Sequence, residues 1–249
     1  ALYRAAGHDV TMVSLTNGDA GHHEHPGPSL AKRRTIEAAS AGAVIGAPYD
    51  LFDIHDGELQ PTLENRWKVI HLIRSLNPDL VLTHRPNDYH PDHRYTSQLV
   101  QDAAYMITVP AVVPGTPHLL TNPVIAYIPD EFRKPYPFEP TVAVDVGPVL
   151  DKVVVMLHCH TSQFYEWLAY NTGTLDQVPA SDADRRAWLA VHVKARLRKQ
   201  AERFRSQLVQ CYGPERGNRV EYAEAFEPCE YGAPLDETAQ QRLFAFLWK

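Results

Sequence analysis

No apolar run in this 249-residue sequence comes near the roughly 18–20 residues that a membrane-spanning helix requires. A signal peptide, with a basic start and an apolar centre, is also lacking. Cysteine is scarce: the three residues Cys159, Cys211 and Cys229 lie far apart and form neither a disulfide framework nor a CxxC zinc knuckle. We therefore expect a cytoplasmic protein with reduced thiols and no transmembrane segment.

An excess of positive charge is lacking as well. The formal net charge is −6, with acidic and basic residues mixed along the chain, which argues against a nucleic acid as partner. Neither GxGxxG nor GxxxxGKS/T follows any apolar run, which disfavours a nucleotide-binding Rossmann protein. Internal repeats and low-complexity linkers are missing, so we expect a single domain over residues 1–249.

Short apolar runs alternate with longer amphipathic segments along the chain. The runs predict strands at 8–16, 49–54, 79–84, 123–128 and 141–146. Helical spacing of apolar residues predicts helices at 29–46, 62–78, 91–107, 147–171 and 181–208. We expect the tail to add an edge strand within 220–231 and a closing helix at 236–248. This alternation is typical of right-handed βαβ units and predicts an α/β fold, a Rossmann-like three-layer sandwich with a mainly parallel sheet.

Local signals define two of these helices more closely. Ser29 is expected to cap the helix at 29–46, and Thr62 stands at the start of the helix at 62–78. A shared buried face of that second helix is expected from four residues at helical spacing, namely Trp67, Ile70, Ile73 and Leu76. The strand that follows, at 79–84, is expected to be buried.

Polar loops follow three of the predicted strands, at 17–25, 55–58 and 85–93. Open α/β sheets bind their ligands at the carboxyl ends of strands, so these loops are candidates for one site. Histidine is abundant, with thirteen residues in the chain, and it clusters in these loops.

The segment HPDH, residues 90–93, has the spacing of a metal site at a helix start. Pro91 suits the first helical position, which puts His93 in the first turn and His90 at the helix entrance. Both imidazoles can then face one side and offer nitrogen to a metal, while Asp92 could hold one ring in a chosen tautomer. The alternative is that histidine and aspartate serve here only as cap and turn residues.

The segment THRPNDYHPDHRYTS, residues 83–97, closely resembles the second signature of the PIG-L/LmbE-like family of zinc-dependent N-acetylglucosaminyl deacetylases. The resemblance extends to VSLTNGDAG, HDGEL and HTSQ, and to the helix that carries Arg34, Glu37 and Gly46. It reaches across roughly residues 1–165. It implies metal-assisted hydrolysis of an amide on an aminosugar or its conjugate, with Zn2+ as cofactor, although Fe2+ could occupy the same ligands.

The resemblance also implies roles for individual residues. His93 matches the third zinc ligand of the family. His90 matches the imidazole that stabilises the oxyanion or protonates the leaving amine, and Asp92 matches the residue that orients it. The positions assigned to substrate binding are Asp19, Arg34, Asp56 and Asp88, of which Asp88 falls where some relatives carry a tyrosine.

One family segment is missing. The first signature, HPDD-x-E, supplies two further zinc ligands and the general base, and it precedes the helix in which this sequence begins. We therefore expect that the first strand is missing, that this chain is nearly inactive as it stands, and that it exposes an apolar slot and aggregates. The alternative is a non-catalytic carbohydrate-binding or regulatory protein on the same fold.

Two other histidine pairs carry weaker signals. His22 and His23 lie in a histidine-rich loop that could bind a metal, but adjacent histidines rarely hold one ion and an exposed loop is the simpler interpretation. His158 and His160 are two apart in a predicted helix, so they are expected to face different ways.

Overall fold

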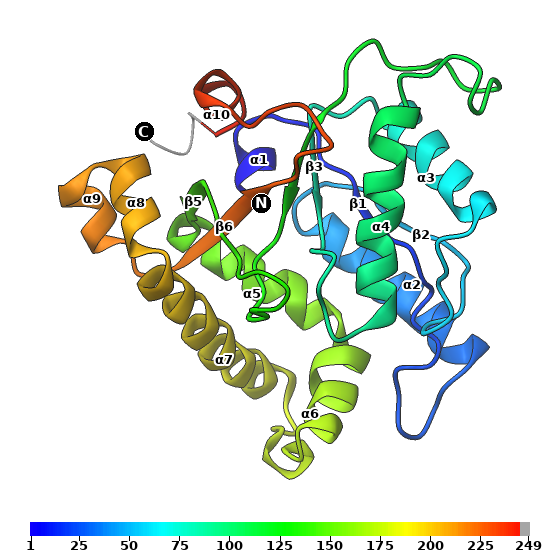
Figure 1. Cartoon of the computed structure of the whole chain (residues 1–249). Helices are drawn as coiled ribbons and strands as arrows, with labels where there is room; N and C mark the ends of the chain where they lie inside the picture. The colour runs from blue at the N-terminus through cyan, green and yellow to red at the C-terminus, as the bar shows by residue number, and fades with distance from the viewer. Residues whose placement is uncertain (245–249) are drawn as a thin grey trace. The chain divides into compact units, whose positions relative to one another are not determined.

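The computed structural model describes residues 1–244, which form two compact units. Unit 1 contains residues 1–58 and 146–202, and unit 2 contains residues 59–145 and the chain from residue 203. Each unit is therefore built from two separate stretches of chain. Figure 1 draws the helices and strands of both. The expectation of a single domain stays a prediction.

Unit 1 combines a short parallel sheet with several helices. Strand β1 pairs with β2 in parallel, with Met12 opposite Tyr49. Helix α2 packs against α5 and β2, and it buries Leu30, Ala38 and Ala41 in the core of the unit. The elements are α1 (Leu2–Ala5), β1 (Met12–Ser14), α2 (Pro28–Ala43), β2 (Tyr49–Leu51), η1 (Gly147–Val149), α5 (Leu150–Cys159), the π-helix η2 (Ser162–Trp167), α6 (Leu168–Asn171), η3 (Leu175–Gln177) and α7 (Asp182–Arg203).

Unit 2 is built on a four-stranded sheet in the order β3-β4-β6-β5. Strands β3 and β4 are parallel, whereas β6 runs antiparallel to both of its neighbours. Helices α3 and α4 pack on each other, and α8 packs on β5 (Figure 1). The elements are α3 (Leu63–Leu76), β3 (Leu80–Thr83), α4 (Pro91–Met106), β4 (Val124–Tyr127), β5 (Val142–Asp145), α8 (Arg205–Tyr212), α9 (Pro214–Arg219), β6 (Ala223–Pro228) and α10 (Glu237–Phe244).

The α/β class predicted from the sequence is confirmed, and its strands lie within the predicted ranges. The pairing is mixed: β1–β2 and β3–β4 are parallel, and both pairings of β6 are antiparallel. The prediction of an edge strand in the tail is wrong, because β6 lies between β4 and β5. Hydrogen bonding on both sides fits its composition, since Ala223, Ala225 and Phe226 are buried.

Helix boundaries and faces differ from the sequence predictions in three places. Helix α2 begins one residue before Ser29: Gly27 occupies the cap position and Pro28 the first turn, where its missing N–H is no loss. In α3, Ile70 and Ile73 are buried as expected, but Trp67 is 49% exposed and Leu76 is 43% exposed. Thr62 caps this helix as expected, and its hydroxyl accepts from the Asn65 amide.

The strand predicted as buried is only partly so. Leu82 on β3 is 41% exposed, and among the described residues of unit 2 β3 pairs with one strand, β4. The closing helix is present as α10 from Glu237 to Phe244, and residues 245–248 of that prediction lie outside the described part of the chain. Within residues 1–244 no helix has both the length and the apolar character needed to cross a membrane.

Candidate functional site

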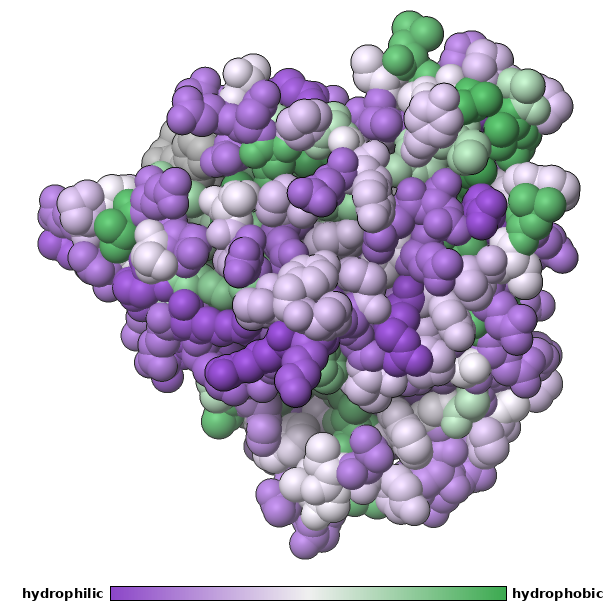
Figure 2. All heavy atoms as spheres, in the orientation of Figure 1, coloured by the Kyte–Doolittle hydropathy of each residue, from purple (hydrophilic) through white to green (hydrophobic). Residues whose placement is uncertain are grey.

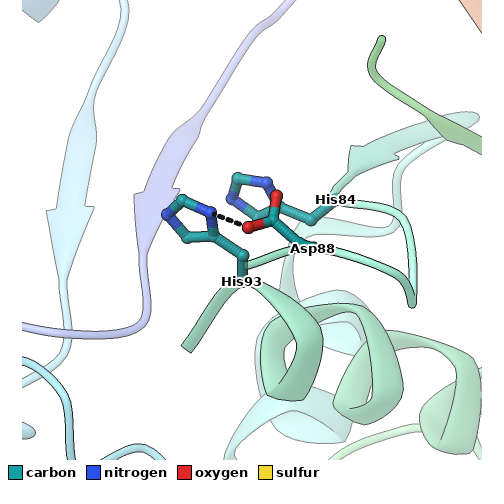
Figure 3. Close-up of side chains that lie close together, drawn as sticks. All are labelled: His84, Asp88 and His93. Atoms are coloured by element: carbon teal, nitrogen blue, oxygen red, sulfur yellow. Dashed lines mark hydrogen bonds and ion pairs between the residues drawn. The ribbon is translucent and has the colours of Figure 1, made fainter. Parts of the chain in front are cut away.

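Three potential metal ligands gather in unit 2, where β3 ends and α4 begins. His84 directly follows β3, Asp88 lies in the connecting loop, and His93 stands in the first turn of α4. One nitrogen or oxygen of each residue lies within 4.8 Å of those of the other two. Figure 3 shows the two imidazoles stacked, with the Asp88 carboxylate beside them. Residues nine positions apart are thus brought into one cluster by a strand end and a helix start.

Asp88 determines which nitrogen of the neutral His93 ring carries the proton. Its Oδ1 lies 3.0 Å from Nδ1 of His93. A carboxylate accepts hydrogen bonds, so Nδ1 carries the proton and the lone pair of Nε2 is left for a ligand. The Asp88 carboxylate is itself held, because it also accepts from the His90 amide at 2.9 Å. This is the arrangement in which a carboxylate orients a metal-binding imidazole.

The imidazole of His84 stacks on that of His93, so the two rings do not point at a common position. The ring centroids are 4.3 Å apart and the planes differ by 2°. Each ring would need to direct an in-plane lone pair at an ion about 2.0–2.1 Å away. The lone pairs of two stacked rings lie in separate parallel planes and do not meet at one point. One ring therefore has to turn before both can bind one ion. Burial lowers the pKa of His84 to about 4, with the adjacent His93 adding to the shift, so His84 is neutral near pH 7.

His90 presents a donor where His93 presents an acceptor. It caps α4, with its Nδ1 accepting from the Asp92 amide at 3.3 Å. The neutral ring must therefore carry its proton on Nε2. Asp92 is buried, and its carboxylate accepts from the amide of Leu59 at 3.3 Å. The segment 90–93 thus holds one imidazole as a hydrogen-bond donor and another as a potential metal ligand.

Residues 1–104 match the family model described as GlcNAc-PI de-N-acetylase, PIG-L. Over these residues the chain is similar to the PIG-L family. The matched residues include the HPDH segment, so the resemblance found in the sequence is confirmed. Among curated proteins, the 4-oxalmesaconate hydratase of Pseudomonas putida is 25% identical over 185 residues, which is 71% of this chain and 71% of that protein.

Solved structures share the fold of this chain. GalB, the 4-carboxy-2-hydroxymuconate hydratase of Pseudomonas putida, has a TM-score of 0.66 at 19% identity, over 91% of this chain and 86% of its own. The N,N'-diacetylchitobiose deacetylase of Pyrococcus horikoshii has a TM-score of 0.66 at 20% identity, over 92% and 76% of the two chains. One fold therefore carries a hydratase and a deacetylase.

The other residues assigned from the PIG-L resemblance cluster in unit 1. Asp19 is buried and its carboxylate is fully engaged: Oδ2 lies 2.6 Å from Nδ1 of His55, and Oδ1 accepts from the Asp56 amide at 3.0 Å. Burial opposes ionisation of Asp19, but these two hydrogen bonds outweigh it and hold the pKa of the carboxyl below its ordinary value. The hydrogen bond between Asp19 and His55 also raises the pKa of His55, whose side chain is 67% exposed.

Arg34 packs against the loop that carries Asp19. Its Nη2 donates to the carbonyl of Gly21 at 2.7 Å and to Oε1 of Gln163 at 2.5 Å. Gly18 has a φ of +72°, and a Cβ there would lie 2.6 Å from Nη1 of Arg34. The guanidinium is 14% exposed and Nη1 lies 3.9 Å from the Asp56 carboxylate. Arg34 therefore supports the loop through contacts that leave little of it for a ligand.

The weaker histidine candidates have structural partners. His22 is buried, its Nδ1 accepts from the amides of Glu24 and His25, and its Nε2 lies 2.8 Å from Glu166. The interpretation of this segment as an exposed polar loop is therefore wrong for His22. The Nδ1 atom of His158 lies 2.7 Å from the hydroxyl of Tyr165, so this ring has a structural partner.

Sequence reasoning missed two residues of these clusters. It gave His84 no role, although the residue stands at the end of a strand directly before the polar loop. It also passed over His55, which precedes the assigned Asp56. Both follow predicted strands, and that position was the available signal.

A cavity of about 440 Å3 in unit 2 carries no such chemistry. It is lined by Trp67 and by residues 111–114. Figure 2 shows hydrophobic atoms gathered at the surface where Figure 1 draws the loop after α4, and Leu120 there is 90% exposed. The cavity is apolar, and the candidate ligands lie elsewhere in the unit.

Proposed function

We propose that this chain is a metal-dependent hydrolase that removes the acetyl group from an N-acetylated aminosugar or its conjugate. The observation that carries the proposal is the cluster of His84, Asp88 and His93 beside the helix cap His90. The match of residues 1–104 to the GlcNAc-PI de-N-acetylase model supports the choice of substrate.

The donor set fits a divalent transition metal. The imidazoles of His84 and His93 are ligands that zinc and iron(II) accept, and Asp88 orients the His93 ring so that its second nitrogen can bind the ion. Zn2+ is the proposed cofactor, with Fe2+ as the alternative. The ion supplies a Lewis acid that polarises the acetyl carbonyl. Rotation of the His84 ring out of its stack would complete the pair of imidazoles.

His90 stabilises the oxyanion in this proposal. It acts there as a hydrogen-bond donor: its Nε2–H donates to the developing oxyanion, and the Asp92 amide keeps the neutral ring in that tautomer. Asp88 holds the His93 ring rather than touching the sugar. Asp19, Arg34 and Asp56 are proposed to form the sugar-binding surface of unit 1, in which Asp19 and Arg34 hold the loops in place and the exposed His55 is the group open to solvent.

The test is acetate release from N-acetylglucosamine derivatives, together with the metal content of the protein. It should be run on the 249-residue chain loaded with Zn2+ and, separately, with Fe2+. His93→Ala should abolish activity and bound zinc. Asp88→Asn should weaken metal affinity by about 10- to 100-fold, as loss of an orienting partner does. His118→Ala, an exposed histidine of unit 2, serves as control.

Two results would overturn the proposal. One is full activity of His93→Ala. The other is absence of acetate release by every form of the wild-type protein, with metal bound. Binding of the sugar without turnover would instead support a non-catalytic carbohydrate-binding protein on this fold.

A second candidate is a hydratase. The observation in its favour is the 25% identity over 185 residues to 4-oxalmesaconate hydratase. It would use the same His90 donor and metal ligands to add water across a carbon–carbon double bond. Loss of the ultraviolet absorbance of 4-oxalmesaconate without acetate release from any acetylated sugar would favour it over the deacetylase.

A further inference from the structure

One large aromatic side chain stands exposed beside the candidate metal centre. Tyr89, in the loop directly before α4, is 73% exposed. Single exposed aromatic residues are common on protein surfaces, so exposure alone decides nothing. The neighbours of this ring and the way its backbone is held decide more.

The Tyr89 ring stands perpendicular to both imidazoles of the HPDH segment. Its centroid lies 5.7 Å from that of His90 with an interplanar angle of 87°, and 5.8 Å from that of His93 with an angle of 82°. These are edge-to-face distances, which aromatic pairs favour. Phe132 adds a tilted contact at 6.3 Å. The ring is thus fixed against the two histidines while most of its surface remains open to solvent.

The backbone beneath Tyr89 is also held in place. Nη1 of Arg94 donates to the carbonyl of Asp88 at 2.7 Å and to that of Tyr89 at 3.0 Å. The Asp88 carboxylate accepts from the His90 amide on the other side. A side chain on a backbone clamped this way loses little freedom when a ligand binds, so its contact contributes more to affinity.

From this placement we infer that Tyr89 is a specificity-determining residue on which the pyranose ring of the substrate stacks. The inference rests on the proposed deacetylase function. A pyranose has an apolar face of C–H groups, which matches the negative face of a phenol ring. A sugar held there would have its acetamido group next to His90 and His93. A small unsaturated acid, the substrate of the second candidate, has no such face.

The test compares Tyr89→Ala and Tyr89→Phe in acetate release from an N-acetylglucosamine derivative by the full-length protein. We expect Tyr89→Ala to raise KM about 3- to 10-fold with kcat and zinc content nearly unchanged, because one aromatic contact is lost. Tyr89→Phe should behave like wild type. Tyr105→Ala is the matched control, since Tyr105 is 68% exposed at the far end of α4. With N-acetylethanolamine, which lacks the ring, Tyr89→Ala should cost nothing.

The outcomes separate the two ideas. If wild type neither binds nor deacetylates any acetylated aminosugar, the proposed function fails and the inference fails with it. If wild type is active and Tyr89→Ala leaves KM unchanged, only the stacking inference is overturned. It is overturned as well if Tyr89→Phe is as impaired as Tyr89→Ala, or if Tyr89→Ala loses zinc and kcat, which would show a supporting role for the imidazoles.

Discussion

The proposed roles of three histidines, His22, His90 and His93, follow from the partner of each Nδ1 atom. In His93 that atom donates to Asp88, so Nε2 is free to bind a metal. In His90 it accepts from the Asp92 amide, so Nε2 is a donor. In His22 it accepts from two backbone amides while Nε2 contacts Glu166, so the ring is wholly structural. The same side chain can thus serve as a metal ligand, a hydrogen-bond donor or a structural anchor, depending on the partner of its Nδ1 atom.

Glu166 gives a pH dependence that can be predicted. The two nitrogens of Arg33 donate to its carboxylate at 2.6 and 2.7 Å, and these bonds, against the effect of burial, lower the pKa of Glu166 from 4.5 to about 2. A carboxyl with a depressed pKa stabilises the folded state above pH 4.5, and this stabilisation is lost as the pH falls toward 2. We therefore expect the free energy of unfolding to fall across this window.

Urea unfolding of wild type and Glu166→Gln at several pH values between 7 and 2.5 measures the effect. The variant should be about 1–3 kcal/mol less stable at pH 7 and should converge with wild type at the acid end. Glu64→Gln is the control, because Glu64 is an exposed partner of Lys68 and its loss should cost little. Parallel pH curves for wild type and Glu166→Gln would contradict the assignment.

At the residue scale the sequence predicted positions better than roles. The spacing of His90, Pro91 and His93 was sufficient to place both rings at the start of a helix, because Pro91 suits the first turn. The contact between Asp88 and His93 was not predictable. It depends on how the loop from 85 to 89 folds back on α4, and turn residues permit many such paths.

At the scale of elements, the π-helix η2 shows where a local pattern is insufficient. The sequence SQFYEW predicts a continuing α-helix, but its wider turn directs three side chains at α2: Ser162 to Glu37, Gln163 to Arg34, and Glu166 to Arg33. π-Bulges are rare and frequently lie near functional sites. Their cause here is the set of contacts across to α2, which no window of neighbouring residues contains.

Arg74 organises the loop that follows α4. It is buried on α3, and its guanidinium donates to six backbone carbonyls, those of Met106, Ile107, Val109, Val112, Val113 and Thr116. A loop lacks the regular backbone hydrogen bonds of a helix or sheet, so its carbonyls need other donors. Here the Arg74 guanidinium supplies them. Because this apolar loop carries so many bonds to one cation, we expect its shape to depend on that cation.

Arg74→Met should therefore destabilise the protein by about 3–5 kcal/mol, since it leaves several carbonyls without a donor. Arg66→Met on the same helix is the matched control: Arg66 forms an ion pair with Asp102 at the partly exposed surface, and its loss should cost under about 1 kcal/mol. Chemical unfolding measures both. Equal losses in the two variants would show that the loop does not depend on Arg74.

At the scale of the whole molecule, the order of strands and helices was predictable and the pairing was not. Alternating apolar runs and helical periods were sufficient to find β1 to β5 and the long helices. The antiparallel insertion of β6 between β4 and β5 joins residues about 80 to 100 positions apart, and local propensity carries no information on such contacts. The tail therefore looked like an edge strand in the sequence.

The sheet of unit 2 has an open side that bears on association. Strand β3 is paired only with β4 within the unit, and Leu82 on it is 41% exposed. An unpaired strand edge with apolar side chains can pair with another chain. We expect the 249-residue chain to self-associate at micromolar concentration, and Leu82→Lys to reduce this association, because a charge on an edge strand opposes pairing. Light scattering after size-exclusion chromatography measures both.

Leu120→Lys distinguishes the strand edge from the apolar loop as the cause. Leu120 is 90% exposed in the loop after α4, so it is the more accessible of the two leucines. If Leu120→Lys restores a monomer and Leu82→Lys does not, association proceeds through the loop and the edge of β3 is protected. A wild-type chain that is monomeric and unfolds in one cooperative step would contradict association through either the edge of β3 or the loop.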